Sequence, residues 1–335
     1  MNRACRVCGV SVDKAKTFTC FEMMFGTRES FEYVLCDSCG CLQISDIPAD
    51  LARHYPSDYY SSEVDSRARI FLKGCRLRFD LGGISLLGLL MSRRFGPDSC
   101  AQAIRVGNIQ KNDRVLDLGG GAGSHLRPMR SAGFRNLLCV DPFVQKEFRE
   151  SGLEVRRASV EDVEGQFRLI MMHHSFEHMI DPNAVLAAIR HKLADNGVLL
   201  VRIPLLGYGW REYGIDWIEL DAPRHLYLHS KKSFTELAER NGFEVLDVTF
   251  DSTDLEMWGS EQYAQGISLF SAESHGVNPA TSRFSAAQIQ NFREKIQGLN
   301  ERGESGRAAF VLRKNKRGHL HLDGKAGERQ GDLQG

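Results

Sequence analysis

The sequence predicts an α/β protein in which a mostly parallel sheet is covered by helices on both faces, with a small cysteine-rich unit before it. Two observations support this prediction. Between residues 101 and 250, short apolar runs alternate with amphipathic stretches, which is the pattern of strands joined by crossover helices. In addition, six of the nine cysteines lie in residues 1–45. We therefore expect two structured parts of unequal size.

The composition narrows the class of protein. The chain has 335 residues, 42% of them hydrophobic, so it can bury a substantial core. Lys plus Arg and Asp plus Glu number 43 each, which gives no general attraction to nucleic acid or to an anionic membrane. The first ten residues, MNRACRVCGV, lack the apolar run of a secretory signal. We therefore expect a cytoplasmic, reducing location, with no nucleic-acid partner and no stable membrane insertion.

Residues 1–45 carry two knuckles, CRVCG and CDSCG. Their spacing predicts a structural zinc ribbon with the ligands Cys5, Cys8, Cys36 and Cys39. Two intervening residues let both sulfurs of a knuckle face one ion, and four thiolates leave no position open for water. Cys20 and Cys41 are expected to pack, although Cys41 could compete as a ligand. Buried free cysteines, a redox pair and a nucleic-acid module are the alternatives.

Residues 46–100 are expected to form a linker and a helical region. They include the tyrosine-rich stretch HYPSDYYSS, where Tyr55, Tyr59 and Tyr60 are expected to pack between the two parts rather than to contact substrate. They also include LGGISLLGLLM, the most apolar stretch of the chain, at 81–91. That stretch is too short to cross a bilayer, so it predicts a buried helix joining two domains, with membrane association as the alternative.

The larger, α/β part is expected to span 101–314, and the Gly-rich tail at 315–335 is expected to be disordered. The candidate strands are 114–118, 136–140, 153–157, 168–173, 197–203, 243–250 and a last strand at 308–314. The candidate helices are 124–132, 145–150, 182–194, 231–241 and the helix-prone stretch 285–299.

The stretch VLDLGGGAG places Gly119, Gly121 and Gly123 in a turn directly after a predicted strand. Glycine lets the backbone approach a ligand closely at the carboxyl end of a strand, where open α/β sheets bind ligands. Asp117 precedes the turn, and its charge would repel a pyrophosphate and favour a cationic ligand. Asp141 ends the next strand and can accept hydrogen bonds from both hydroxyls of a ribose. A dehydrogenase is the alternative on this architecture.

The turn, followed by an acidic residue after the second strand, resembles motif I of the class I S-adenosylmethionine (AdoMet) methyltransferases. The resemblance continues in ASVEDVEGQFRLIMMHHSFEHMIDP, in HKLADNGVLLVRIP and in DAPRHLYLHS. It implies a Rossmann-like domain with a mostly parallel, seven-stranded sheet and an antiparallel final strand. It further implies that AdoMet is the cofactor.

The same resemblance assigns cofactor contacts. Asp117 and the three glycines of the turn would hold the methionine moiety, and Asp141 would hold the ribose. Ser159 and Val160 would flank the adenine, and His173 would line the methyl-donor pocket together with His174.

Methyl transfer to a hydroxyl or an enolisable carbon needs a base. The candidates for this role are His174, His178, His225 and His229, of which the sequence favours His225, with Glu177 orienting a neighbour. For any one histidine, a purely structural role is the alternative. Arg224 would bind a nucleotide-sugar phosphate or pair with a carboxylate. The sequence further suggests that Tyr227 and the stretch MWGSEQY, at 257–263, bind a sugar.

A four-cysteine unit before such a domain is similar to deoxysugar C-methyltransferases and to methyltransferases of surface-polysaccharide synthesis. This resemblance implies AdoMet-dependent, in-line methylation of a sugar or nucleotide-sugar by means of a histidine base. One alternative is O-methylation of a small metabolite or quinone precursor. Another is a non-catalytic zinc-ribbon adaptor that retains a vestigial nucleotide-binding fold.

Overall fold

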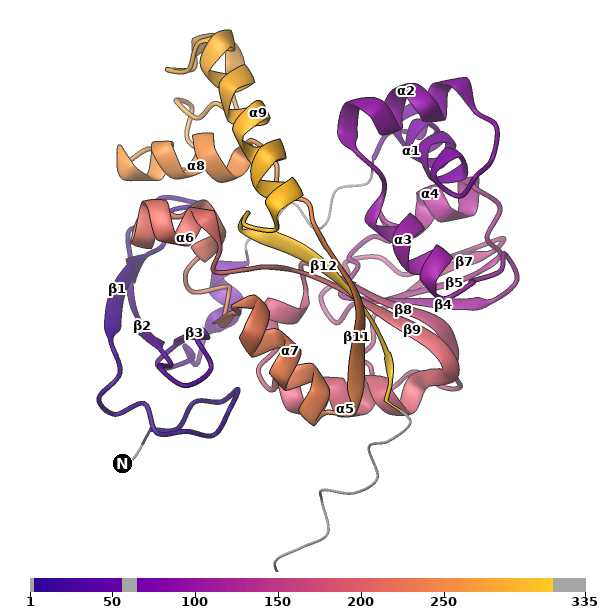
Figure 1. Ribbon diagram of the computed structural model, residues 1–335, viewed down its shortest axis with the longest axis horizontal. Coiled ribbons are helices and arrows are strands. Elements are labelled where there is room, and N and C mark those ends of the chain that lie inside the picture. The colour runs from indigo at the N-terminus through magenta and orange to yellow at the C-terminus, as the bar shows by residue number, and fades with distance from the viewer. Residues whose placement is uncertain (1–2, 56–64, 316–335) are drawn as a thin grey trace, which may run out of the picture.

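The computed structural model describes residues 3–55 and 65–315 (Figure 1). The predictions for Tyr59 and Tyr60, and for a disordered tail beyond residue 315, fall outside the described residues.

The described residues form a central sheet of eight strands in the order β11-β12-β9-β8-β4-β5-β7-β6. The inner pairs are parallel, whereas β12 runs antiparallel to both of its neighbours and β6 runs antiparallel to β7. The predicted α/β class and antiparallel final strand are confirmed. The strands are β4 Arg114–Leu118, β5 Asn136–Val140, β6 Phe148–Glu150, β7 Leu153–Arg156, β8 Phe167–His173, β9 Leu193–Pro204, β11 Phe243–Phe250 and β12 Arg307–Lys314.

The helix predicted at 145–150 is wrong, and it accounts for the eighth strand. Residues 148–150 form β6, which pairs along β7 with Phe148 opposite Val155. A three-residue segment gains little from helix propensity, so pairing with a neighbouring strand decides its conformation.

Helices cover both faces of the sheet, because its strands alternate between two cores. Along β4, Leu116 and Leu118 join one buried cluster while Val115 joins the other. The helices α3 and α4 lie over one face, and α5 and α7 lie over the other (Figure 1). Their bounds are α3 Ser99–Val106, α4 Leu126–Ser131, α5 Pro182–Lys192 and α7 Lys231–Arg240.

The cysteine-rich unit is not separate from the catalytic part. It contributes β1 Thr17–Phe21, β2 Ser30–Leu35 and β3 Leu42–Ile44 to a second sheet, whose fourth strand is β10, Tyr227–Leu228. The pairing of β10 with β3 is antiparallel. The segment after Asp221 is therefore built into the N-terminal sheet.

The described residues between 46 and 98 hold the short 3-10 helix η1 Leu51–His54 and two helices, α1 Arg67–Asp80 and α2 Leu86–Phe95, that pack on each other. The prediction that 81–91 forms a buried joining helix is wrong. Residues 81–85 form the connection between the two helices, and Leu86, Leu87 and Leu90 of α2 are exposed. No helix in residues 3–55 or 65–315 has the length and apolar character needed to cross a bilayer.

Further helices pack beyond the sheet. They are α6 Tyr208–Tyr213, α8 Leu255–Ala264, α9 Ala286–Arg302 and the 3-10 helices η3 Phe176–His178, η4 Gly214–Asp216, η5 Ile218–Leu220 and η6 Pro279–Thr281. The stretch 257–263, expected as a sugar-binding loop, lies within α8. Trp258, Gln262 and Tyr263 are all buried there, so they serve the packing of α8.

Candidate active site and metal centre

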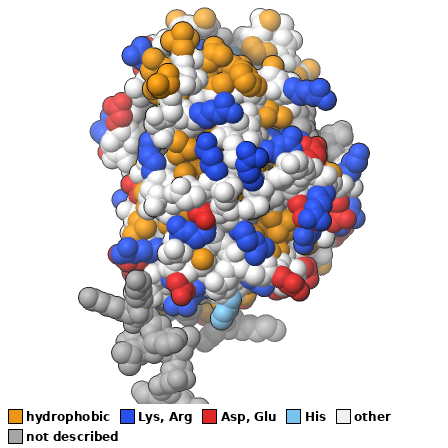
Figure 2. Space-filling model, turned by 90° about the vertical axis from the view of Figure 1, so that its right-hand side faces the viewer, with side chains coloured by type: hydrophobic (Ala, Val, Ile, Leu, Met, Phe, Trp, Pro, Cys, Tyr) orange, Lys and Arg blue, Asp and Glu red, His pale blue; other side chains and the backbone are white. Residues whose placement is uncertain are grey.

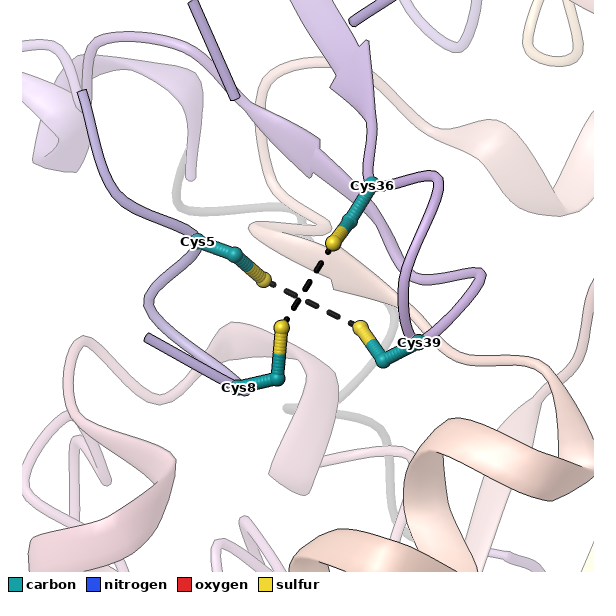
Figure 3. A group of neighbouring side chains, drawn as sticks. All are labelled: Cys5, Cys8, Cys36 and Cys39. Carbon is teal, nitrogen blue, oxygen red and sulfur yellow. Dashed lines mark hydrogen bonds between the residues drawn. The ribbon is translucent and has the colours of Figure 1, made fainter. Parts of the chain in front are cut away.

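The four predicted zinc ligands converge. The Sγ atoms of Cys5 and Cys39 lie 3.8 Å apart, and those of Cys8 and Cys36 lie 3.5 Å apart (Figure 3). All four sulfurs lie within 4.8 Å of one another. A tetrahedral zinc with Zn–S distances of about 2.3 Å needs sulfur–sulfur separations of about 3.8 Å, so the cluster fits this ion.

The other two cysteines of the unit do not join this group. Cys20 Sγ contacts the Phe18 carbonyl oxygen and Cys41 Sγ contacts the Leu42 carbonyl oxygen, and both residues are buried. They act as packing residues.

The glycine turn after β4 has the backbone that only glycine adopts readily. Gly119, Gly121 and Gly123 have φ values of 71°, 53° and 76°. Gly120, which the sequence pattern did not single out, is equally restricted. A Cβ atom on Gly120 would lie 2.3 Å from Oδ2 of Asp117. The turn therefore needs the full run of glycines to fold against the acidic side chain.

Asp117 is fully buried, and neither of its carboxylate oxygens has a hydrogen-bond partner. Burial, together with the nearby charge of Asp141, raises the pKa of Asp117 to about 7. A buried carboxyl group without a partner is costly, and a cation supplied by a ligand removes that cost. The cofactor that the turn implies carries an ammonium group on its methionine moiety, so Asp117 fits it.

Asp141 is held in place by the turn. Its Oδ2 accepts a hydrogen bond from the Gly121 N–H at 2.9 Å, and its Oδ1 accepts one from the Phe143 N–H at 2.8 Å. Phe143 is 78% exposed, and its ring stacks with Tyr55 at a centroid distance of 6.2 Å. Tyr55 therefore links the N-terminal part to the segment that follows Asp141.

The residues expected near the adenine lie in a short loop after β7. Ser159 uses its backbone N–H and its hydroxyl to donate to Oδ2 of Asp162, both at 2.9 Å. Val160 is buried. The loop is thus stiffened by Asp162, which the sequence reasoning did not assign.

At the end of β8, His173 is buried and stacks on His125 at a centroid distance of 4.0 Å. The next residue, His174, has a φ of 51°, an uncommon value for a residue other than glycine. Ser175 follows and donates its hydroxyl to the Leu118 carbonyl oxygen at 2.8 Å. This contact fixes the segment after β8 against the glycine turn.

His174 is hydrogen-bonded on both ring nitrogens. Arg202, which can only donate, lies with Nη1 2.9 Å from Nε2, so Nδ1 carries the proton. Nδ1 then donates to Oε1 of Glu177 at 3.2 Å. His174 therefore orients Glu177, and its own lone pair is already occupied.

His225 presents a free lone pair. Its Nδ1 lies 2.7 Å from the Glu219 carbonyl oxygen, an obligate acceptor, so Nδ1 carries the proton. Nε2 lies 3.9 Å from Oε1 of Glu177 and 3.8 Å from Oδ2 of Asp221. Burial lowers the pKa of His225, although the negative charge of Asp221 acts to raise it. The ring is therefore neutral at pH 7.

His178 adjoins this pair. Its Nδ1 lies 2.8 Å from the Arg224 carbonyl oxygen, and its ring centroid lies 4.8 Å from that of His225. Burial lowers the pKa of His178 to about 3. One ligand-capable atom from each of Glu177, His178 and His225 lies within 4.8 Å of the others. The three predicted residues thus form one polar cluster.

Arg224 pairs with carboxylates, as one of its two predicted roles required. It is fully buried, and Nη2 lies 2.6 Å from Oδ1 of Asp221 and 2.8 Å from Oε1 of Glu22. Its Nη1 donates to the His54 carbonyl oxygen at 3.1 Å. Because the side chain is fully buried and paired with two carboxylates, the structure favours the carboxylate role over the phosphate role.

Two further candidates lie inside the fold. Tyr227 Oη donates to the Ile180 carbonyl oxygen at 2.8 Å, and it accepts from Nε of Arg6. His229 is buried beside Ser233. These contacts hold both side chains in the packing around β10.

The comparisons with known proteins agree with this geometry. Residues 93–248 match a family model described as "Methyltransferase domain". The matched segment contains the glycine turn, Asp141, Glu177 and His225, so this segment is a methyltransferase domain and the chain is an enzyme of that class. No curated protein sequence matches the chain.

Solved methyltransferase structures are similar to the chain at low sequence identity. A putative sarcosine dimethylglycine methyltransferase from Galdieria sulphuraria is 14% identical over 72% of this chain and 98% of its own, with a TM-score of 0.44. A cyclopropane synthase from Mycobacterium tuberculosis is 16% identical over 64% and 84%, with a TM-score of 0.41. A SAM-dependent methyltransferase from Archaeoglobus fulgidus is 18% identical over 68% and 99%, with a TM-score of 0.39.

Proposed function

We propose that the protein transfers a methyl group from AdoMet to a sugar or nucleotide-sugar, with His225 as general base, and that the four cysteines hold a structural zinc. The observation that supports AdoMet most directly is the buried Asp117 carboxylate, which lacks a partner beside a glycine turn. Asp117 would bind the ammonium group, Asp141 the ribose, and the Ser159–Val160 loop the adenine. When bound, AdoMet supplies an electrophilic methyl group.

His225 would take the proton from the acceptor. Its Nε2 lone pair faces Glu177 and Asp221 across gaps of 3.9 and 3.8 Å, which are too wide for direct hydrogen bonds. An acceptor oxygen to the side of the line that joins either pair of atoms could lie about 2.8 Å from both of them. The Glu219 carbonyl, which accepts from Nδ1, would stabilise the imidazolium once Nε2 is protonated.

The polar character of this cluster supports an acceptor rich in hydroxyl groups. Burial raises the pKa of Glu177 well above its usual range, which favours the protonated carboxyl, a group that can donate as well as accept. The Oε2 atom of Glu177 is buried and has no hydrogen-bond partner, so it can bind a substrate hydroxyl. The resemblance to sugar-modifying methyltransferases adds the sugar class to the proposal.

The test is methyl transfer by the full chain from labelled AdoMet to two sets of acceptors. One set contains nucleotide-sugars and deoxysugars, and the other contains phenols and quinone precursors. The expected result is labelling of a nucleotide-sugar or deoxysugar. Labelling of a phenol or quinone precursor instead would replace the sugar by a small aromatic acceptor. A folded protein that binds no S-adenosylhomocysteine would point to the adaptor function.

The base is tested separately, with whichever acceptor is labelled. His225→Ala should slow turnover by about 100-fold or more and leave the affinity for S-adenosylhomocysteine unchanged. His191→Ala, at an exposed histidine of α5, is the matched control and should change neither quantity. Wild-type turnover by His225→Ala would place the base elsewhere.

A further inference from the structure

Apolar side chains gather on the outward side of α2. Ile84 is 107% exposed, and Leu86, Leu87 and Leu90 are 74%, 48% and 55% exposed. Single exposed hydrophobic residues are normal, but a group of them on one helix face marks an interaction surface. We call these four residues, together with Arg93 and Arg94 in the last turn of the helix, the α2 face.

Packing against α1 explains why this face points outward. A Cβ atom on Gly88 would lie 2.3 Å from the Cys75 carbonyl oxygen, so Gly88 is where the two helices touch. Leu86 and Leu90 lie two residues before and after Gly88, about 200° around the helix from it. The leucines are therefore on the far side from α1, and Arg94, four residues after Leu90, shares their side.

The surroundings of the α2 face are strongly basic. Residues 66–97 contain seven basic residues, namely Arg67, Arg69, Lys73, Arg76, Arg78, Arg93 and Arg94, although the whole chain has a net charge of zero. They contain one acidic residue, Asp80, which is buried and accepts from the Ser92 hydroxyl and the Asp98 N–H. No carboxylate is therefore exposed within 66–97, and the flanking Asp65, 11% exposed, pairs with Arg69 and Lys73. Figure 2 shows hydrophobic side chains at the upper end of this side, above Lys and Arg side chains.

We propose that the α2 face docks on the surface of a bilayer that contains anionic lipid. The leucines would enter the boundary between headgroups and acyl chains, and the arginines would contact anionic headgroups. Charge favours this occupant over a second copy of the chain, because two such faces would oppose arginine to arginine with no exposed carboxylate to pair with.

Docking would also bring the methyltransferase domain close to the lipid. α1 packs on α4, and a Cβ atom on Gly74 would lie 2.6 Å from the Ser131 hydroxyl oxygen. α4 begins three residues after Gly123, the last glycine of the turn. The hairpin formed by α1 and α2 therefore packs on α4, which is the helix that follows the glycine turn.

The test is co-sedimentation of the full chain with vesicles of phosphatidylcholine alone and with about 30% phosphatidylglycerol. Binding is expected to the anionic vesicles, and about 0.5 M salt should weaken it, because salt screens the arginine contribution. Equal binding to both vesicles, or none to either, would overturn the proposal.

Two variants separate the contributions of the α2 face. Leu86→Gln/Leu90→Gln should lower vesicle binding by about tenfold or more through loss of apolar burial. Arg93→Gln/Arg94→Gln, which leaves all apolar contacts in place, should lower binding to anionic vesicles by a similar factor. Ile215→Gln/Val277→Gln changes exposed apolar residues elsewhere on the surface and is the matched control, which should bind as wild type.

Affinity for S-adenosylhomocysteine should be unchanged in all three variants, which shows that each is folded. Full vesicle binding by both α2-face variants would overturn the proposal. A wild-type dimer in solution that the leucine variant converts to a monomer, without vesicle binding by either, would assign the face to a second copy instead.

Discussion

The hydroxyl of Tyr33 donates a hydrogen bond to the backbone carbonyl of His225, at 2.8 Å. Both residues are buried. Tyr33 belongs to β2 of the cysteine-rich unit, whereas His225 is the candidate base of the methyltransferase domain. The adjoining Ile44 N–H donates to the Leu226 carbonyl oxygen at 3.0 Å. The N-terminal unit therefore fixes the backbone that carries His225.

Tyr33→Phe should lower the free energy of unfolding by about 1–3 kcal/mol, because it leaves the His225 carbonyl buried without its donor. Urea unfolding measures this. Turnover should fall while the affinity for S-adenosylhomocysteine is kept, since the change touches the acceptor side only. Tyr213→Phe removes a hydroxyl that donates to Glu261 instead, and it is the control. Equal loss of turnover in both variants would refute a specific role for Tyr33.

Glu22→Gln tests the buried ion pair between the two parts. Although burial acts to raise it, hydrogen bonds from the Phe25 N–H and from Arg224 hold the pKa of Glu22 below 4.5. A depressed pKa contributes stability above the pKa of the unfolded chain, and this stability is lost as the pH falls through the folded pKa. Glu22→Gln should therefore cost about 1–3 kcal/mol at pH 7 and less below pH 4.

Urea unfolding at the two pH values measures this difference. Glu29→Gln, at a partly exposed carboxylate that pairs with Arg53, is the control and should cost less than about 1 kcal/mol. The ion-pair role of Glu22 would be contradicted if the difference in the free energy of unfolding between wild type and Glu22→Gln were larger below pH 4 than at pH 7.

Metal analysis of the purified chain should find about one zinc per chain. Cys36→Ser should lose it and lower the melting temperature by about 10 °C or more, since metal binding contributes folding free energy. Cys20→Ser and Cys41→Ser should keep the metal, because neither sulfur belongs to the four-thiol group. Retention of zinc by Cys36→Ser, or its loss from Cys41→Ser, would revise the ligand set.

Periodicity predicted the strands of the catalytic sheet well, because buried parallel strands are apolar on both faces. Valine and leucine runs such as 114–118 and 136–140 match β4 and β5 to the residue. The wrong predictions concern segments whose conformation or burial is decided by tertiary packing. The stretch 81–91 is apolar enough for a core helix, but Gly88 turns only one side of α2 toward α1.

The site was predicted in part. Local motifs singled out Asp117, Asp141 and the four cysteines, and the structure brings the four sulfurs together. The contacts between distant segments, such as Glu22 with Arg224, could not be predicted from spacing. One signal was available in the sequence. Arg202 is a lone charge in the apolar strand VLLVRIP, and a largely buried charge needs partners, which here are the carboxylate of Asp251 and the ring of His174.

Calorimetric titration with S-adenosylhomocysteine tests the central claim, that the Asp117 carboxylate binds the cofactor's ammonium group. The pKa of about 7 keeps Asp117 largely protonated at pH 6, so affinity should fall by up to about tenfold between pH 8 and pH 6. Asp117→Asn should bind more weakly at pH 8 and show no such dependence, whereas Asp195→Asn, at an exposed carboxylate, should match wild type. Tight, wild-type binding by Asp117→Asn at pH 8 would contradict the claim.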